Sequence, residues 1–521
     1  MPITAITIEN FKCIQEPVRI EFKPVTLLFG PNSSGKSTIL QALHYAREVF
    51  ERENVDPGQT IGGGKPLDLG GFENLVCNHN LSLPIIIKLD LDLKDEDLPV
   101  YVPKEYISGG VPYLDELAEA SGHASRTTKT AWVEIRICYS NWLKKPIVDS
   151  YEVGINDNLL ARITASKDGR QIMLSYYDWD YTGNDDVDIE VQPGFNEKEH
   201  SDVPLNIFGQ LSALPRWGQP LDIESSVKYS DLDDDMARYF TDYGLSKMHT
   251  WIVGPGEMVR DALRKLLYIG PLRELPPRNY LPERSPDAAR WSSGIMSWDV
   301  LYRAEKSFIK EINQWLTRKD RLNSGYRIEV KRFKELDIND PITMMLSGGP
   351  GLEEVEIIQS RVNDLTVKSR VAIREEMTGI ELMPQDVGIG ISQVLPVIVG
   401  ALYVKEGIFS IEQPELHIHP AFQVALGDLF ISQIQEKNVS FLLETHSEHL
   451  MLRFLRRIRE TSEDELPPGK WPLKPDQLAV YYLEQSDKGV KTTKIRIDED
   501  GEFIDRWPKG FFDEREDELL Y

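Results

Sequence analysis

Residues 26–43 read TLLFGPNSSGKSTILQAL, and this stretch decides the fold. The apolar residues before the loop predict a short buried strand, and the residues after it have the spacing of a helix. Between them lies the pattern G-x-x-x-x-G-K-[ST], which is carried by Gly30, Gly35, Lys36 and Ser37. This strand–loop–helix context is the one that a phosphate-binding loop requires. An ordinary glycine-rich turn is the alternative, and the complete motif with these flanks argues against it.

The chemistry of the loop predicts a bound nucleoside triphosphate. Its backbone N–H groups would surround an anion at the N-terminus of the following helix, where the aligned peptide dipoles favour negative charge. We expect Lys36 to contact the β- and γ-phosphates and the Ser37 hydroxyl to bind Mg²⁺. The predicted nucleotide-binding residues of the loop are Gly30, Pro31, Asn32, Ser33, Ser34, Gly35, Lys36, Ser37 and Thr38.

The composition limits the class of protein. A chain of 521 residues is too long for one hydrophobic core, so two or three domains are expected. The net charge of −25 argues against a general nucleic-acid coat and leaves DNA binding to a local basic patch or a partner. The apolar run over residues 394–404 contains Pro396 and is shorter than the roughly 20 residues that span a bilayer. With three scattered cysteines and no signal-peptide layout, we expect a cytoplasmic protein without a membrane partner.

The middle of the chain predicts secondary structure but carries no catalytic motif. Alternating apolar residues predict strands over 3–8, 18–22, 85–93, 132–139, 151–155, 160–165 and 172–177. An amphipathic helix is expected over 298–317. Further strands are expected over 326–330, 342–346, 355–358 and 365–367.

A second glycine-containing turn precedes an apolar helix within residues 386–404. It contains Gly388, Gly390, Ser392 and Gln393. A turn rich in N–H groups at a helix N-terminus is a candidate phosphate binder. A helix cap at Ser392 explains the same residues equally well.

Two apolar runs near the C-terminus end in residues that suit nucleotide chemistry. Residues 407–411 predict a buried strand that ends in Glu412, and a carboxylate at the tip of a core strand is where a Mg²⁺ ligand for the triphosphate belongs. Residues 439–443 predict another buried strand, followed by Glu-Thr-His-Ser. We expect His446 in this second turn to lie within reach of the γ-phosphate.

Five motifs together resemble the ABC-class ATPases of the RecF, SMC, Rad50 and OLD type. They are ENFK (9–12), GPNSSGKST (30–38), GIGISQ (388–393), EQPELHIHP (412–420) and ETHSEH (444–449). The resemblance implies that residues 30–38 are the Walker A loop and residues 386–393 the signature motif. It also implies that Glu412 is the Walker B metal ligand, that His446 is the switch histidine and that the cofactors are ATP and Mg²⁺. Residues 69–74 lie where the Q-loop of these ATPases is expected, but we assign no residue of this segment to nucleotide binding.

The resemblance also implies an α/β fold of the P-loop NTPase class. We expect an ABC-type head with a mixed sheet flanked by helices, an antiparallel β lobe and a large α+β insertion. The expected domains are an N-terminal lobe (1–93), an inserted β-rich and helical region (94–380) and a C-terminal lobe with a tail (381–521). The family usually places a catalytic glutamate after the Walker B acid, whereas this chain has Gln413. An amide is a poor proton acceptor near neutral pH, so either Glu415 substitutes or hydrolysis is slow.

In such ATPases two heads enclose two ATP molecules, which implies a homodimer or a higher homo-oligomer. With only about 70 residues after His446, we expect no TOPRIM nuclease domain of the OLD type. The chain is similar to the Septu-type ATPases of prokaryotic defence systems. The resemblance therefore implies a sensor or regulatory subunit of an anti-phage complex that controls a separate effector nuclease. A RecF-like DNA-repair ATPase and a nuclease hidden in the insertion remain alternatives. Four arginines on the helix after His446 form either a DNA-facing ridge or a solvated face: Arg453, Arg456, Arg457 and Arg459.

Overall fold

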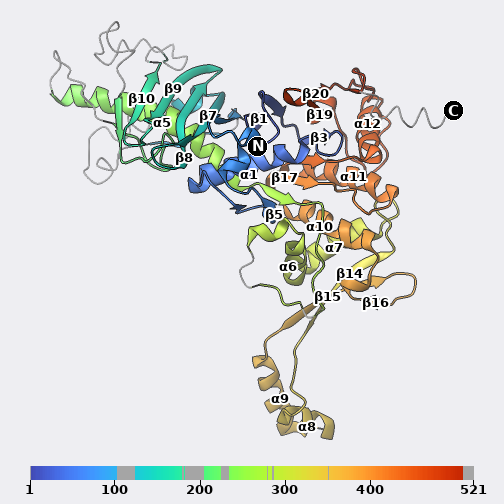
Figure 1. The fold of residues 1–521 in the computed structure, drawn as a ribbon. Helices are drawn as coiled ribbons and strands as arrows, with labels where there is room; N and C mark the ends of the chain where they lie inside the picture. The colour runs from blue at the N-terminus through green and yellow to red at the C-terminus, as the bar shows by residue number, and fades with distance from the viewer. Residues whose placement is uncertain are drawn as a thin grey trace.

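The computed structural model describes residues 2–94, 96–101, 122, 124–178, 181, 205–223, 234–278, 280–283, 287–349 and 351–508. Figure 1 shows a body that contains two large β-sheets and a narrow arm that projects from it. The tail beyond residue 508 and parts of the predicted insertion lie outside the described residues.

The strand before the phosphate-binding loop lies inside a six-stranded sheet with the order β13-β17-β18-β3-β19-β20. β13, β17, β18, β3 and β19 are parallel to one another, and β20 is antiparallel to β19. Because parallel strands end at the same edge of a sheet, the ends of β3, β17 and β18 meet there. The strands span Leu267–Ile269 (β13), Glu406–Glu412 (β17), Asn438–Glu444 (β18), Val25–Phe29 (β3), Leu478–Ser486 (β19) and Gly489–Ile495 (β20).

A nine-stranded antiparallel sheet forms the second β layer, with the order β12-β11-β10-β9-β8-β7-β6-β1-β2. Its strands confirm the hairpin and the alternating segments predicted over the first 177 residues. They span Ile3–Glu9 (β1), Val18–Glu21 (β2), Ile85–Asp92 (β6), Thr130–Ser140 (β7), Lys145–Ile155 (β8), Asn158–Ala165 (β9), Ile172–Tyr177 (β10), Leu205–Phe208 (β11) and Asp222–Ile223 (β12). The long helix α5 (Asp234–Arg264) packs on this sheet, and the Tyr151 hydroxyl donates to the carbonyl oxygen of Ile252 at 2.7 Å.

Helices cover both faces of the six-stranded sheet. On one face, α1 (Lys36–Arg52) shares a hydrophobic core with α5 and the antiparallel sheet. On the other face, α10 (Ile389–Tyr403), α11 (Pro420–Glu436) and α12 (Glu448–Ser462) pack in a second core. The short elements β4 (Gln59–Thr60), β5 (Gly64–Asp68) and α2 (Phe72–Leu75) follow α1. This arrangement confirms the predicted α/β class, with a mixed sheet between helices and an antiparallel β lobe.

The region between residues 295 and 382 agrees with the prediction only in part, and β14 (Tyr326–Phe333) confirms the strand expected over 326–330. The single helix expected over 298–317 is two helices, α6 (Ile295–Arg303) and α7 (Lys306–Thr317). A long hairpin of β14 (Tyr326–Phe333) and β15 (Lys368–Glu375), extended by β16 (Glu381–Leu382), leads to the arm in Figure 1. The strand expected over 365–367 is displaced, because β15 begins at Lys368, directly after that segment.

The strands predicted over 342–346 and 355–358 are wrong, because both segments are helical. They lie in α8 (Pro341–Gly348) and α9 (Leu352–Asp364) at the tip of the arm. α8 begins with a proline, and the Asp340 carboxylate accepts from the N–H of Ile342 at 3.0 Å. Both are helix-start signals that outweigh the local strand propensity of the apolar residues. Among the described residues, no helix has the length and apolar character needed to cross a membrane.

Candidate functional site

The loop over residues 30–38 joins β3 to α1 and leaves the N-terminus of the helix open. Its backbone takes positive φ angles at Gly30 (144°), Ser33 (62°) and Gly35 (95°). A Cβ at Gly30 would lie 2.1 Å from a backbone oxygen of β19, so only glycine fits there. The N-cap of α1 is Gly35, and no side chain caps the helix. Its first N–H groups are therefore left for a ligand.

Lys36 lies between this loop and the ends of the neighbouring strands. Its side chain is buried, and Nζ donates to the carbonyl oxygens of Gly30 (3.0 Å) and Pro31 (2.8 Å). Nζ also lies 4.0 Å from Oε1 of Glu444. Burial lowers the pKa of Lys36, and the nearby carboxylates of Glu444 and Glu412 oppose this shift. The ammonium group is thus placed where it can meet a phosphate bound to the loop.

Two glutamates face the loop from adjacent parallel strands. Glu412 ends β17 and Glu444 ends β18, and the register of the strands pairs these two residues. The Ser37 hydroxyl donates to Oε2 of Glu444 at 2.7 Å. Burial and the neighbouring Glu444 raise the pKa of Glu412 to about 7, and burial also raises the pKa of Glu444. The result is a buried pair of carboxylates next to a hydroxyl group.

This donor set fits Mg²⁺. Carboxylate and hydroxyl oxygens are hard ligands, and Mg²⁺ in nucleotide sites usually adds phosphate and water oxygens to one or two protein carboxylates. A divalent cation would also offset the repulsion between Glu412 and Glu444. Among the described residues, no group of three or more His, Cys, Asp and Glu side chains is placed to hold a metal ion by itself, so Mg²⁺ here would need phosphate and water oxygens as further ligands. Sequence reasoning named Ser37 and Glu412 but missed Glu444, although it also follows an apolar strand directly.

Gln413, the residue after Glu412, has an unusual backbone conformation. Its φ angle of 43° lies in the left-handed region, which costs a non-glycine residue about 1–2 kcal/mol. The Gln413 N–H donates to the carbonyl oxygen of Glu444 at 2.7 Å. Such conformations persist only where the surroundings enforce them, and they are frequent at functional sites.

Glu415, the other candidate base, is fully engaged by its own chain. Oε2 accepts from the Thr445 hydroxyl at 2.8 Å, and Oε1 accepts from the His446 N–H at 2.7 Å. Burial raises the pKa of Glu415, while these hydrogen bonds oppose the shift. The carboxylate thus ties the turn after β18 to the end of β17. This role leaves it poorly placed to take a proton from water.

The turn held by Glu415 positions His446. Burial and the charge of Lys36 lower the pKa of His446, which favours the neutral imidazole at neutral pH. Its Nε2 atom is buried and has no hydrogen-bond partner among the described residues. This nitrogen can therefore interact with a group that enters the site.

The second glycine turn starts α10, with Gly388 as the N-cap and no side-chain cap. The alternative of a cap at Ser392 is wrong, because Ser392 is buried within the helix and its hydroxyl donates to the carbonyl oxygen of Ile389 at 2.8 Å. Gly388 is exposed, and a Cβ at Gly390 would lie 3.2 Å from the carbonyl oxygen of His417. The turn thus lies beside the segment after β17, with Gly388 at the surface.

Two residues that sequence reasoning missed hold the end of β17. The Tyr268 hydroxyl donates to Oε1 of Glu412 at 2.8 Å. Arg273 is buried, and Nη2 donates to the carbonyl oxygens of Glu412 (2.8 Å) and Gln413 (3.0 Å). Burial lowers the pKa of Arg273 to about 10, so the guanidinium remains charged at neutral pH. Tyr268 lies in β13, which pairs with β17 in parallel, and Arg273 lies in the loop that follows β13.

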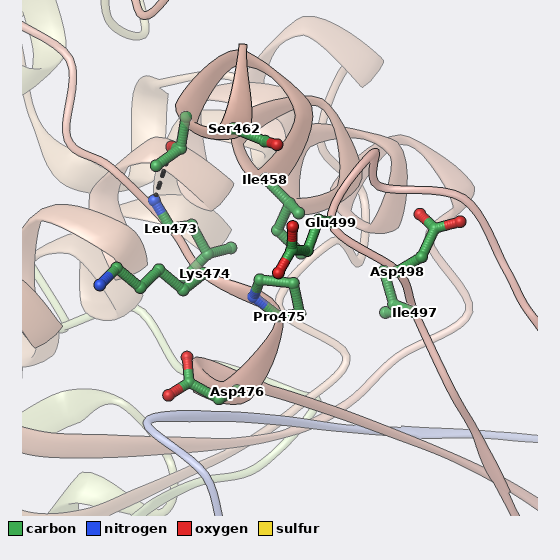
Figure 2. A pocket seen from close by; sticks show the side chains of 10 residues that line it. Ile458, Ser462, Leu473, Lys474, Pro475, Asp476, Ile497, Asp498 and Glu499 are labelled. Carbon is green, nitrogen blue, oxygen red and sulfur yellow. Dashed lines mark hydrogen bonds between the residues drawn. The ribbon is translucent and has the colours of Figure 1, made fainter. Parts of the chain in front are cut away.

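A groove of about 680 Å³ lies away from this loop, between the end of α12, the turn Pro475–Gln477 and the residues after β20 (Figure 2). Its charged lining residues are Lys474, Asp476, Asp498 and Glu499. Three carboxylates against one lysine disfavour an anion. The groove is therefore a poor nucleotide site, and the loop over residues 30–38 remains the candidate.

The four arginines of α12 are engaged by carboxylates. Arg457 is buried and donates to both carboxylate oxygens of Asp428, at 2.8 and 3.0 Å. Arg453 lies 3.7 Å from the same carboxylate, while Arg456 pairs with Glu460 at 2.6 Å and Arg459 pairs with Glu502. Both earlier interpretations are wrong for Arg457, which is neither on a ridge nor solvated.

Comparisons with known proteins agree with the loop chemistry. The family model described as "AAA ATPase domain" matches residues 1–110 and 295–451, together just over half of the chain. A second model, described as "Protein of unknown function (DUF3696)", matches residues 473–520. No curated protein sequence matches the chain.

Solved structures show weak likeness. An SMC head bound to the C-winged helix domain of ScpA has 9% identity and a TM-score of 0.38, with 95% of this chain and 98% of that chain covered. The SMC head domain from Thermotoga maritima has 9% identity and a TM-score of 0.36, with 95% and 100% covered. TM-scores this low carry no inference about function. The family match, which includes the phosphate-binding loop and both carboxylate strands, is sufficient: the chain belongs to the AAA ATPase domain family.

Proposed function

We propose that the chain is an ABC-type ATPase that binds ATP with Mg²⁺ on the loop over residues 30–38 and hydrolyses it slowly. The observation that carries this proposal is the hydrogen bond from Ser37 to Glu444. It joins the N-terminus of α1 to the paired ends of β17 and β18, across 407 residues of sequence. The site at the uncapped N-terminus of α1 thus contains the Ser37 hydroxyl, the Lys36 ammonium group and the carboxylates of Glu412 and Glu444.

Each residue has a role that follows from its chemistry. Lys36 and the loop N–H groups would hold the β- and γ-phosphates, while Ser37 with Glu412 and Glu444 would hold Mg²⁺. Bound Mg²⁺ would supply charge neutralisation on the phosphate oxygens. Gln413 can orient a water molecule but cannot accept its proton usefully. Turnover is therefore expected to be slow and the ATP-bound state long-lived.

The proposal includes a dimer in which the start of α10, at Gly388 and Gly390, caps the nucleotide of the other copy. Ser392 and Gln393, which the sequence also suggested for this role, are buried inside their own chain and support the turn from within. The exposed, uncapped start of α10 supports the dimer, because its N–H groups are available to a phosphate outside the chain. ATP would favour the dimer through contacts of its γ-phosphate that ADP cannot make.

We further propose the domain division 1–93, 94–380 and 381–521 for this head and its insertion.

The biological role rests on the five motifs described above. Their resemblance to Septu-type and OLD-like ATPases supports a cytoplasmic sensor or regulatory subunit of an anti-phage complex, with a separate effector nuclease as partner. The DNA-binding alternative loses its main local support, because the arginines of α12 are paired with carboxylates. Among the described residues of the insertion, no cluster of metal-ligating side chains supports a nuclease there.

The dimer is tested by measuring molar mass in solution with Mg·ATP and with Mg·ADP. We expect the wild-type chain to form a dimer with ATP and to remain monomeric with ADP. Gly388→Arg should prevent the dimer, because a long side chain would block the start of α10. The fold tolerates this change, since a Cβ at Gly388 meets nothing within 4 Å.

Gly348→Arg is the matched control, because a Cβ there is also in open space and the residue ends α8 at the tip of the arm. It should dimerise like the wild type. A wild-type chain whose mass does not respond to ATP, or a Gly388→Arg variant that dimerises normally, would contradict the proposed assembly.

A further inference from the structure

The loop after β13 brings a buried arginine to the end of β17. β13 and β17 are parallel neighbours, with Ile269 opposite Ile411, so the chain that leaves β13 runs beside the end of β17. Backbone hydrogen bonds to the turn before α6 fix this loop: the N–H of Gly270 donates to Ser292 at 2.8 Å and that of Glu274 to Ser293 at 2.7 Å. Arg273 is 4% exposed, whereas the preceding Leu272 is 72% exposed. The loop thus directs one side chain inward.

The guanidinium of Arg273 acts on the backbone of residue 413. Nη2 donates to the carbonyl oxygens of the two peptide units that flank this residue, those of Glu412 and Gln413. The N–H of Gln413 is held from the other side by the carbonyl oxygen of Glu444. These contacts fix both backbone polar groups of a residue whose left-handed conformation is intrinsically unfavourable. The direction of the side chain at position 413 depends on that conformation.

The same arginine is tied to α10. The Arg273 N–H donates to Oε1 of Gln393 at 3.3 Å, and Nε2 of Gln393 donates back to the Arg273 carbonyl oxygen at 2.9 Å. Gln393 lies in the first half of α10 and is 7% exposed. A short chain of contacts therefore runs from residue 413 through Arg273 to the helix that starts at the second glycine turn.

Stability alone does not explain this arginine. Nε and Nη1 of Arg273 are buried and have no hydrogen-bond partner among the described residues. A buried charged group with unsatisfied donors is unfavourable, and an apolar side chain of similar volume would avoid that penalty. Besides the attraction of the nearby Glu415 and Glu412 carboxylates, its guanidinium makes two hydrogen bonds, both to the backbone at residues 412 and 413.

We propose that Arg273 is a positioning residue for ATP hydrolysis, which holds residue 413 in the conformation that directs its side chain and links it to Gln393 of α10. This inference rests on the proposed ATPase function. Arg273 acts through residue 413 and does not bind the nucleotide. Its loss should therefore lower kcat and leave the affinity for Mg·ATP nearly unchanged.

The test uses the full chain carrying Gln413→Glu, so that position 413 holds a proton acceptor. Arg273→Met is added to this parent, and kcat is measured by single turnover beside the Kd for Mg·ATP. We expect kcat to fall about 30- to 100-fold, because small misplacements of a catalytic group have effects of this size. The Kd should stay within about threefold, since the phosphate-binding residues are untouched.

Arg273→Lys is the conservative variant and covers the case in which Arg273→Met does not fold. It keeps the charge but lacks the planar fork, so an intermediate loss of about tenfold in kcat is expected. Arg321→Met is the matched control, because Arg321 stacks on Trp315 away from β17. Its kcat should match that of the parent.

Full kcat in folded Arg273→Lys or Arg273→Met would overturn the inference. So would a loss of Mg·ATP affinity as large as the loss of kcat, because Arg273 would then act in binding. A parent chain that neither binds nor turns over Mg·ATP would contradict the proposed function itself, which separates the two failures.

Discussion

Lys36→Ala is expected to lower the affinity for Mg·ATP at least about 100-fold and to abolish measurable turnover. Nζ lies within 4.0 Å of Glu444 and reaches two carbonyl oxygens of the loop, so it lines the space in which phosphates would lie. Two charge-assisted hydrogen bonds to phosphate oxygens contribute about 1.5–3 kcal/mol each, which corresponds to this loss. Equilibrium binding of a fluorescent ATP analogue measures the affinity.

The control for this variant is Lys12→Ala. Lys12 lies in the turn between β1 and β2, and burial lowers the pKa of its amino group. Among the described residues, its side chain makes no hydrogen bond to the loop over residues 30–38. The Lys12 variant should bind Mg·ATP within about tenfold of the wild type. Equal affinities for wild type and Lys36→Ala would show that the nucleotide binds elsewhere.

Gln413→Glu is expected to raise turnover about 100-fold. General-base catalysis contributes about 10²–10⁴-fold, and the amide at position 413 cannot supply it. Glu415 is an inadequate substitute, because Thr445 and His446 occupy its two carboxylate oxygens. Steady-state phosphate release with saturating Mg·ATP measures the change in kcat.

Glu415→Gln provides the comparison for that experiment. An amide can still accept one hydrogen bond from the turn after β18, so we expect less than a tenfold change in kcat. If Gln413→Glu has no effect and Glu415→Gln abolishes turnover, then Glu415 is the base and our assignment of the two residues is wrong.

The part of the site that is local in sequence was predictable. The strand, the loop and α1 form one continuous motif, and the motif specifies its own conformation through glycines and a helix start. Glu412 was also predictable, because a carboxylate directly after a buried strand has few structural uses. The α/β class followed from the same motif and from the apolar runs that became β17 and β18.

The residues that shape the site from a distance were not predictable. Tyr268 and Arg273 reach Glu412 only because β13 pairs with β17, and nothing in their local sequence specifies that pairing. Glu444 has a local signal, but its contact with Ser37 depends on the order of strands in the sheet. The apolar runs alone did not predict the helices of the arm, because short apolar runs fit both a strand and a helix. The local signal for α8 is the capping residue Asp340 followed by a proline.

One titration tests the central claim, that residues from both ends of the chain form a single Mg²⁺–nucleotide site. ATP is titrated into the wild-type chain by calorimetry, with Mg²⁺ and again with EDTA. We predict one ATP bound per chain and an affinity at least about tenfold higher with Mg²⁺, because Ser37, Glu412 and Glu444 would hold the cation beside the phosphates. Binding that is indifferent to Mg²⁺, or no binding at all, would contradict this account.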